Sequence, residues 1–184
     1  MILHRCFAWN RGARHDAIDG PLWFPQLYQG EGRHDNPEEY GCLYLADRAV
    51  CCVIEQLAAF RGQRLSSSIL RRRGLPLALA AIELNDDAPL LDLDDPVILR
   101  REQLRPSVVA TRDRRVTQPQ ALHLHRRHPN AAGLKWWSSW EALWANATIF
   151  NRAAAALRLL DVHELTLDEP ATAEAAEWFG LRRL

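Results

Sequence analysis

The chain has 184 residues, and its 23 lysines and arginines balance 23 aspartates and glutamates, giving a formal net charge of +0. This balance excludes a general electrostatic attraction to nucleic acid or to an anionic membrane. Lys135 is the only lysine, so any anion site must be a local arginine cluster. The length and the 48% of hydrophobic residues predict a single domain over residues 1–184.

The cysteines indicate a reducing compartment. The four form no CxxC pair, and Cys51 and Cys52 lie in an apolar run, where they are typical of small core residues. The first residues are not a basic segment leading into an apolar core, and no apolar run is long enough to span a bilayer. We therefore expect a cytoplasmic protein that does not enter a membrane.

Hydrophobic periodicity predicts several short strands and a few helices, and so an α+β fold. Strands are expected at residues 2–9, 42–46, 77–84, 90–93, 134–138, 147–151 and 160–167. One helix is expected over 49–60 with Asp47 as its N-cap, a second from Thr117 as N-cap toward His128, and a third from Thr172 onward. The remaining segments are expected to be a loop at 11–39, a polar turn at 66–74 and irregular structure at 100–115.

Glu55 is the only ionisable side chain in the apolar run 49–60. On a helix its i±3 and i±4 neighbours are cysteines and alanines, so its face is small and apolar. Carboxylates are rarely placed on such faces unless they are paired or used in chemistry. The alternative is a glutamate at the rim of a buried helix, or one neutralised by a structural arginine.

Three further residues join Glu55 as candidates. Residues 30–35 (GEGRHD) place Arg33 in a glycine-bearing loop, where the backbone can approach a ligand closely. Tyr44 lies in the middle of a strand, and Ser138 lies at the end of a later one. The sequence thus supplies a guanidinium, an aromatic ring, a carboxylate and a hydroxyl on successive elements.

This order of motifs resembles the RES family, which is named for its Arg, Glu and Ser. The matching elements are Leu3-His4-Arg5, Gly32-Arg33, Tyr44-Leu45-Ala46, Glu55, Gly133-Leu134-Lys135-Trp136-Trp137-Ser138 and Ile149-Phe150. The resemblance covers about residues 2–152, and a strand and helix over 160–184 follow. The chain has His34 where the family usually has an aromatic residue, and Ser139 where an arginine commonly follows the serine. Ser138 and Ser139 both remain candidates for the serine role, and the spacing to Gly133 favours Ser138.

The resemblance implies an ADP-ribosyltransferase-like fold with a mixed β-sheet core, flanking helices and NAD⁺ as the substrate. It implies cleavage of the nicotinamide–ribose bond by water or phosphate, in the toxin of a bacterial type II toxin–antitoxin pair. The alternatives are ADP-ribose transfer to a protein and a non-catalytic RES-like module that binds a partner. The implied partner is an Xre-type helix-turn-helix antitoxin that occludes the active site, and homo-oligomerisation stays open.

The resemblance also implies roles for single residues. Glu55 would bind the ribose hydroxyls and stabilise positive charge at the anomeric carbon. Arg33, together with Arg5, would hold the pyrophosphate. Tyr44 would pack on nicotinamide or ribose, and Ser138 would form a hydrogen bond to nicotinamide or to a ribose hydroxyl.

Other residue clusters have simpler interpretations. His123, His125 and His128 are expected on a solvated helix face rather than around a metal, so we expect no metal site. Helical spacing of the tryptophans favours packing over a ligand platform. Those tryptophans are Trp137, Trp140 and Trp144. The basic clusters at 71–73 and 112–115 are expected to be solvated or to face an acidic partner, with no direct binding of nucleic acid.

Overall fold

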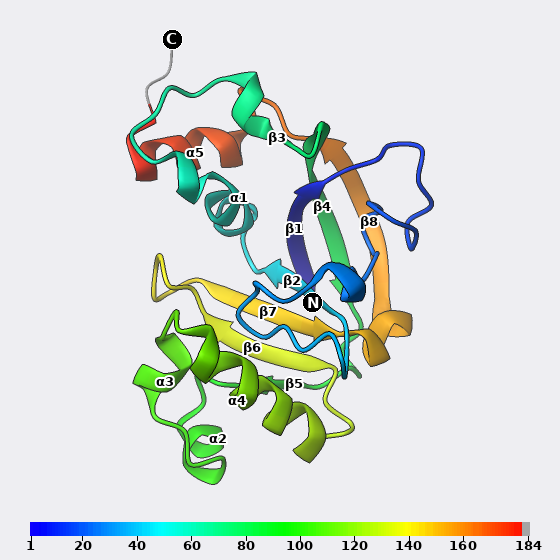
Figure 1. Ribbon diagram of the computed structural model, residues 1–184, viewed down its shortest axis with the longest axis vertical. Coiled ribbons are helices and arrows are strands. Elements are labelled where there is room, and N and C mark those ends of the chain that lie inside the picture. Colours follow the sequence, from blue (N-terminus) through cyan, green and yellow to red (C-terminus); the bar gives the residue numbers. More distant parts are fainter. Residues whose placement is uncertain (182–184) are drawn as a thin grey trace. The chain divides into compact units, whose positions relative to one another are not determined.

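A computed structural model describes residues 1–181 as an α+β fold with a mixed sheet and flanking helices (Figure 1). The strands are β1 (Ile2–Ala8), β2 (Cys42–Ala46), β3 (Arg71–Arg72), β4 (Leu75–Leu84), β5 (Leu90–Asp92), β6 (Gly133–Trp137), β7 (Ala145–Phe150) and β8 (Leu157–Glu164). Their order in the sheet is β3-β4-β1-β2-β7-β6-β5, with β8 also paired to β4. Strand β5 runs parallel to β6, whereas β1–β2, β1–β4, β3–β4 and β6–β7 are antiparallel.

The described residues also form five α-helices, four of them between strands and the last after β8. They are α1 (Ala49–Leu57), α2 (Pro96–Arg101), α3 (Pro106–Ala110), α4 (Arg114–Arg127) and α5 (Pro170–Phe179). Short 3₁₀ turns are η1 (Gln26–Tyr28), η2 (Ala58–Phe60), η3 (Ser67–Leu70) and η4 (Asn151–Ala156).

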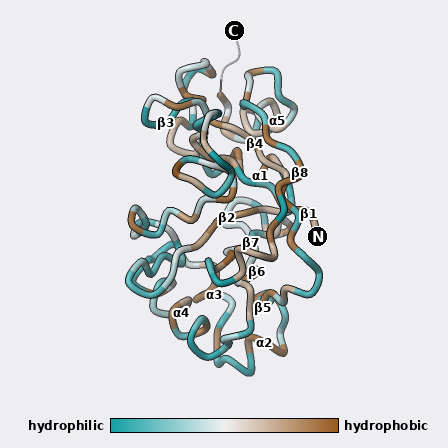
Figure 2. Tube along the Cα trace, turned by 90° about the vertical axis from the view of Figure 1, so that its right-hand side faces the viewer, coloured by the Kyte–Doolittle hydropathy of each residue, from teal (hydrophilic) through white to brown (hydrophobic). Residues whose placement is uncertain are grey.

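The chain divides into two compact units. Unit 1 consists of residues 1–23, 45–83 and 158–181, and unit 2 consists of residues 24–44 and 84–157. Strand β2 therefore contributes residues to both units. Its hydrophobic colouring in Figure 2 agrees with its burial, since four of its five residues are buried and only Tyr44 is half-buried.

Unit 1 is built around α1. This helix packs against β1 and α5 (Figure 1), and six of its nine residues are buried because the run is almost wholly apolar. Helix α5 begins with Pro170 at its first position, where the fixed φ of proline suits a helix start. It ends at Gly180, whose φ of 59° gives a left-handed C-cap.

Unit 2 places three helices over strands β5, β6 and β7. Their apolar side chains form one buried cluster with the strands. Its members are Tyr40, Cys42, Leu91, Leu93, Leu99, Val109, Ala121, Leu124, Leu134, Trp136 and Phe150. Helices α2 and α3 each contribute one residue to this cluster, Leu99 and Val109, and α4 contributes Ala121 and Leu124.

Most predicted strands are confirmed, with shifts at their ends. Strand β2 has the predicted bounds, and β1 ends one residue early. Strand β6 ends at Trp137, so Ser138 lies just beyond it. Strand β8 covers Leu157–Glu164 rather than 160–167.

Helix α1 begins at Ala49 as predicted, but the predicted N-cap residues of α1 and α4 were wrong. Helix α1 has Arg48 rather than Asp47 at its N-cap, with no side-chain cap. Helix α4 begins at Arg114 because the Asp113 carboxylate accepts a hydrogen bond from the Arg115 backbone N–H at 3.0 Å. Thr117 therefore lies inside the helix, and Pro119 does as well.

The segment 100–115 is also more regular than predicted. It contains α3 and the end of α2, both of which start with a proline. The side chain of Asp95 caps α2 by accepting from Val97 N at 2.8 Å. Helix α5 starts at Pro170, two residues before the predicted Thr172.

Candidate functional site

The glycine turn of unit 2 is closed by Asp35. One oxygen of this buried carboxylate, Oδ2, accepts hydrogen bonds from the backbone N–H groups of Gly30 at 2.8 Å and Gly32 at 2.7 Å. Gly32 has no room for a side chain, since a Cβ there would lie 2.5 Å from Asp35 Oδ1 and 2.5 Å from the Tyr44 hydroxyl. The turn therefore requires glycine at position 32 and an acceptor at position 35.

Tyr44 is joined to the same turn through its hydroxyl. It donates to Asp35 Oδ1 at 2.6 Å and accepts from the backbone N–H of His34 at 2.8 Å. Burial, followed by the neighbouring Cys42 and Asp35, raises the pKa of Tyr44 well above its ordinary value. The hydroxyl thus stays protonated and is committed to the turn, while the ring is only half-buried.

Arg33 is buried and held from several sides. Its Nη1 donates to the carbonyl oxygens of Val109, at 2.9 Å, and Thr111. The guanidinium lies 4.5 Å from the ring centroid of Trp136, a cation–π arrangement. Its own carbonyl accepts from Thr117 Oγ1 at 2.6 Å. The predicted anion clamp is therefore a buried positive charge with part of its hydrogen-bonding capacity used by the backbone.

His34 fills the space beside this arginine. Its Nδ1 lies 2.8 Å from Thr148 Oγ1, and its ring meets Trp136 edge-on with centroids 5.4 Å apart. Trp136 Nε1 also donates to Thr148 Oγ1 at 3.1 Å, which leaves the threonine hydrogen for His34 Nδ1. Burial, then the charges of Arg33 and Arg114, lower the pKa of His34 to about 3. The imidazole is therefore neutral and packs as an aromatic ring would.

The two candidate serines have different surroundings. Ser138 is buried, and its Oγ accepts from the backbone N–H of Trp140 at 3.1 Å. Ser139 is exposed, and its Oγ accepts from Arg112 Nε at 3.3 Å and Nη2 at 3.2 Å. Ser138 thus closes the turn after β6, while Ser139 presents its hydroxyl at the surface beside a guanidinium.

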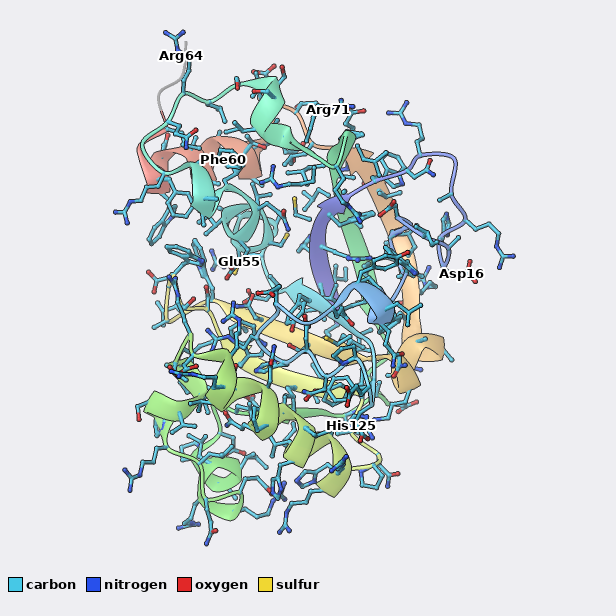
Figure 3. The ribbon with its side chains drawn as sticks, viewed as in Figure 1. Asp16, Glu55, Phe60, Arg64, Arg71 and His125 are labelled. Atoms are coloured by element: carbon cyan, nitrogen blue, oxygen red, sulfur yellow. The ribbon has the colours of Figure 1, made fainter. Side chains whose placement is uncertain are left out.

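Glu55 and Arg5 belong to unit 1. Glu55 lies in the last turn of α1 and is exposed, although Cys51 and Cys52 on the same side are buried (Figure 3). Arg5 is buried in β1, and its Nη1 donates to the carbonyl oxygens of Gly20 at 3.2 Å and Pro21 at 2.6 Å. Arg5 therefore fixes the loop after β1 within unit 1.

The structure brings Arg33 and Tyr44 together through residues that the sequence reasoning did not select. Asp35 binds the turn and Tyr44, and His34 with Thr148 supports Trp136 beneath Arg33. Asp35 had a recognisable signal, because an aspartate after a glycine-rich turn commonly accepts from nearby backbone N–H groups. Thr148 had none, since its role depends on partners far away in the sequence.

The histidines of α4 are not all on a solvated face, contrary to the prediction. His123 is exposed, but His125 stacks on Tyr40 with centroids 4.3 Å apart (Figure 3 labels His125). His128 Nε2 lies 3.1 Å from Glu102 Oε1. Among residues 1–181, no group of three or more His, Cys, Asp or Glu side chains is arranged to hold a metal ion.

The tryptophans at the end of β6 and after it contribute only partly to packing. Trp144 is buried and Trp137 is half-buried. Trp140 is also half-buried and carries the guanidinium of Arg112 at 4.3 Å from its ring centroid. Within the described part of the chain, no helix has the length and apolarity needed to cross a membrane.

Comparison with known proteins identifies related sequences and folds. A family model described as the RES domain matches residues 2–170. A chain from the crystal structure of the M. tuberculosis MbcT-MbcA toxin-antitoxin complex is similar in fold, with a TM-score of 0.61 and 19% sequence identity. That similarity covers 97% of this chain and 88% of the other. The comparison with curated proteins found no match.

Proposed function

Since the chain belongs to the RES domain family, we propose that it is an enzyme that consumes NAD⁺ by breaking the bond between nicotinamide and ribose. The observation that carries the proposal is the closed turn at residues 30–35. Arg33 is part of this turn, and Asp35 binds the turn to the hydroxyl of Tyr44. Two of the five residues expected to act on NAD⁺ thus lie in this turn or are bound to it.

The proposed reaction is a heterolytic substitution at the anomeric carbon. The carbon–nitrogen bond breaks with its electron pair on the pyridine nitrogen, so nicotinamide leaves as a neutral molecule. Positive charge builds on the ribose ring, as in glycoside hydrolysis. Water, phosphate or a protein side chain then forms the new bond to carbon, and water loses a proton in doing so.

Each candidate residue is proposed for one part of this reaction. Glu55 would bind the ribose hydroxyls and stabilise the developing positive charge, for which an exposed carboxylate is available to substrate. The buried charge of Arg33 would favour the pyrophosphate, and Arg5 is proposed for the same role. The half-buried ring of Tyr44 would pack on nicotinamide or ribose. Ser138 or Ser139 would form a hydrogen bond to the substrate.

The test is product analysis with a matched pair of variants. The purified protein should release free nicotinamide from NAD⁺, and Glu55→Gln should lower kcat by about 100-fold or more. Glu174→Gln removes another exposed carboxylate from a helix of unit 1 and should leave the rate unchanged. Full NAD⁺ cleavage by Glu55→Gln would remove the proposed role of this residue.

The products of the same assay identify the group that accepts ADP-ribose. Mass analysis with and without phosphate separates ADP-ribose from its phosphorylated form, and labelled protein would identify ADP-ribose transfer. A protein that binds NAD⁺ without releasing nicotinamide would be the non-catalytic module instead.

We further propose that the protein is the toxin of a bacterial toxin–antitoxin pair, and that its partner is an Xre-type helix-turn-helix antitoxin. Support comes from family membership and from the similar chain in the MbcT-MbcA toxin-antitoxin complex. Expression of the protein should stop bacterial growth, and co-expression of a neighbouring helix-turn-helix protein should restore it. Growth arrest that persists in Glu55→Gln would separate toxicity from NAD⁺ cleavage.

The proposed compartment is the cytoplasm. All four cysteines are unpaired thiols and buried, and burial raises the pKa of Cys6 to about 12. Such thiols are typical of proteins that need no oxidising environment. Fractionation of cells that express the chain checks this, and recovery outside the cytoplasmic fraction would contradict it.

A further inference from the structure

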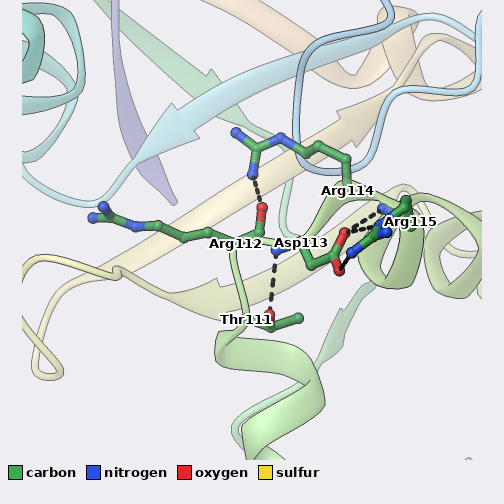
Figure 4. A network of polar contacts seen from close by, with 5 residues as sticks. All are labelled: Thr111, Arg112, Asp113, Arg114 and Arg115. Atoms are coloured by element: carbon green, nitrogen blue, oxygen red, sulfur yellow. Dashed lines mark hydrogen bonds and ion pairs between the residues drawn. The ribbon is translucent and has the colours of Figure 1, made fainter.

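The segment between α3 and the first turn of α4 contains three arginines, Arg112, Arg114 and Arg115, and only Arg115 pairs with a carboxylate of the segment (Figure 4). Arg115 makes a two-point ion pair with Asp113, with Nε–Oδ1 at 3.0 Å and Nη2–Oδ2 at 2.7 Å. This pairing lowers the pKa of Asp113, chiefly through the side-chain hydrogen bond. The carboxylate of the segment is thus fully occupied by Arg115.

Arg114 is held by neutral groups. Its Nε donates to the carbonyl oxygen of Glu31 at 2.9 Å, and its Nη1 donates to the carbonyl oxygen of Arg112 at 2.9 Å. Glu31 belongs to the glycine turn, so this guanidinium lies against the turn that contains Arg33. It is exposed, and its positive charge contributes to the low pKa of His34 after burial and Arg33.

Arg112 is also held without a carboxylate. Its guanidinium stacks on Trp140, and both Nε and Nη2 donate to Ser139 Oγ. Figure 4 shows Arg112 and Arg114 extending to one side of the segment, with Arg115 and Asp113 on the other. Within residues 1–181 neither Arg112 nor Arg114 has an ion pair with a carboxylate.

This arrangement leaves donors available in fixed positions. Arg112 Nη1 and Arg114 Nη2 have no hydrogen-bond acceptor among the described residues. The Ser139 hydroxyl accepts from Arg112 and so keeps its own hydrogen for another acceptor. Planar guanidinium groups whose positions are already fixed lose little entropy when they bind the oxygens of a phosphate.

We propose that Arg112 and Arg114, with the Ser139 hydroxyl, form a phosphate-binding subsite of unit 2 that recognises the substrate as a phosphorylated dinucleotide. The inference rests on the proposed function for its choice of ligand. In this proposal the exposed Arg112 and Arg114 contact the phosphate directly. The buried Arg33 contributes positive charge nearby and holds the glycine turn in place. The phosphate is either the diphosphate of NAD⁺ or an additional 2′-phosphate on its adenosine ribose.

The test measures binding separately from turnover. ADP-ribose is the probe, because it carries the diphosphate and contains no nicotinamide to be released. The double variant Arg112→Gln, Arg114→Gln should bind it about 10- to 100-fold more weakly at low ionic strength. Arg115→Gln, whose guanidinium is already neutralised, should bind it as the wild type does.

Kinetics with NAD⁺ provide the second measurement. Loss of a subsite that binds substrate and transition state equally raises KM and leaves kcat within about twofold. A structural defect would instead lower kcat and the thermal unfolding temperature. Because both arginines are exposed, that temperature should match the wild-type value.

The two proposals fail in different ways. Equal affinity of the wild type and the double variant for both ADP-ribose and 2′-phospho-ADP-ribose, or no measurable binding of either ligand by the wild type, overturns the subsite whether or not NAD⁺ is cleaved. Binding that depends on the arginines in a protein that does not release nicotinamide would instead overturn the proposed reaction and retain the subsite. A larger loss for 2′-phospho-ADP-ribose than for ADP-ribose assigns the arginines to the 2′-phosphate, and equal losses assign them to the diphosphate.

Discussion

Asp35 offers the sharpest test of how the candidate site is assembled. Its two oxygens serve different partners, because Oδ2 accepts from the backbone N–H groups of Gly30 and Gly32 and Oδ1 accepts from the Tyr44 hydroxyl. In Asp35→Asn the amide oxygen can replace Oδ2, and the NH₂ group then faces Tyr44. The tyrosine oxygen already accepts from His34 N, so it must accept twice and its own hydrogen loses its acceptor.

The magnitude follows from these contacts. One hydrogen bond to a charged group is lost in Asp35→Asn, which costs about 1.5–3 kcal/mol of unfolding free energy. Asp35→Ala removes three such bonds and a weaker one from the Cys42 thiol at 3.5 Å, and water entering the half-buried turn limits the total to about 3–5 kcal/mol. Because Tyr44→Phe removes the donor of the same hydrogen bond whose acceptor Asp35→Asn removes, the effects of the two substitutions should overlap by about 1 kcal/mol in the double variant.

Urea unfolding followed by circular dichroism measures the stability of the wild type and of all four variants. Asp16→Asn is the matched control, since that carboxylate is exposed and pairs with Arg14, which is exposed as well. Two results would refute the reasoning. One is Asp35→Asn behaving as the control does, and the other is additive effects of the Asp35 and Tyr44 substitutions within about 0.3 kcal/mol.

Three more variants test the surrounding structure. Burial, and then the charge of Arg152, lower the pKa of His125 to about 4, below its value of about 6.5 in the unfolded chain. The neutral imidazole therefore stabilises the fold above pH 6.5, and this contribution is lost as the pH falls toward 4. In urea unfolding, His125→Phe should lose less stability than the wild type between pH 7 and 4.5, and an unchanged pH dependence would contradict this. Gly32→Ala should destabilise the protein by about 1–3 kcal/mol in thermal unfolding, because its Cβ would lie 2.5 Å from two oxygen atoms. Gly12→Ala is the control and should be neutral, since its Cβ would lie 3.6 Å from the nearest atom. Thr117→Val should lower the unfolding free energy by about 1 kcal/mol, because it removes the hydrogen bond to the Arg33 carbonyl. Thr172→Val is the control and should be neutral or stabilising, since the buried Thr172 hydroxyl has no hydrogen-bond partner among the described residues. The reverse order of stabilities would show that these contacts do not govern stability.

The elements that the sequence predicted well have strong local patterns. Strand β2 was predicted with its observed bounds because CLYLA is a short β-type run in which Tyr44 faces opposite to its neighbours. Helix α1 was predicted because its apolar run is long and uninterrupted by Gly or Pro. One error lies at the start of α4, where one side chain decides the boundary. Both Asp113 and Thr117 can cap a helix, and only the fold directs the Thr117 hydroxyl to Arg33 instead.

By itself the sequence determined the α+β class, the order of the motifs and the family to which they belong, because these depend on short-range periodicity and on residue identity. Tertiary structure alone decided that Arg33 is buried, that His34 is neutral, and that Arg112 and Arg114 have no carboxylate partner among the described residues. The partners responsible are remote, since Arg33 binds a carbonyl 76 residues away and His34 a hydroxyl 114 residues away. Burial and charge at such positions depend on which segments pack together, and no local pattern records that packing.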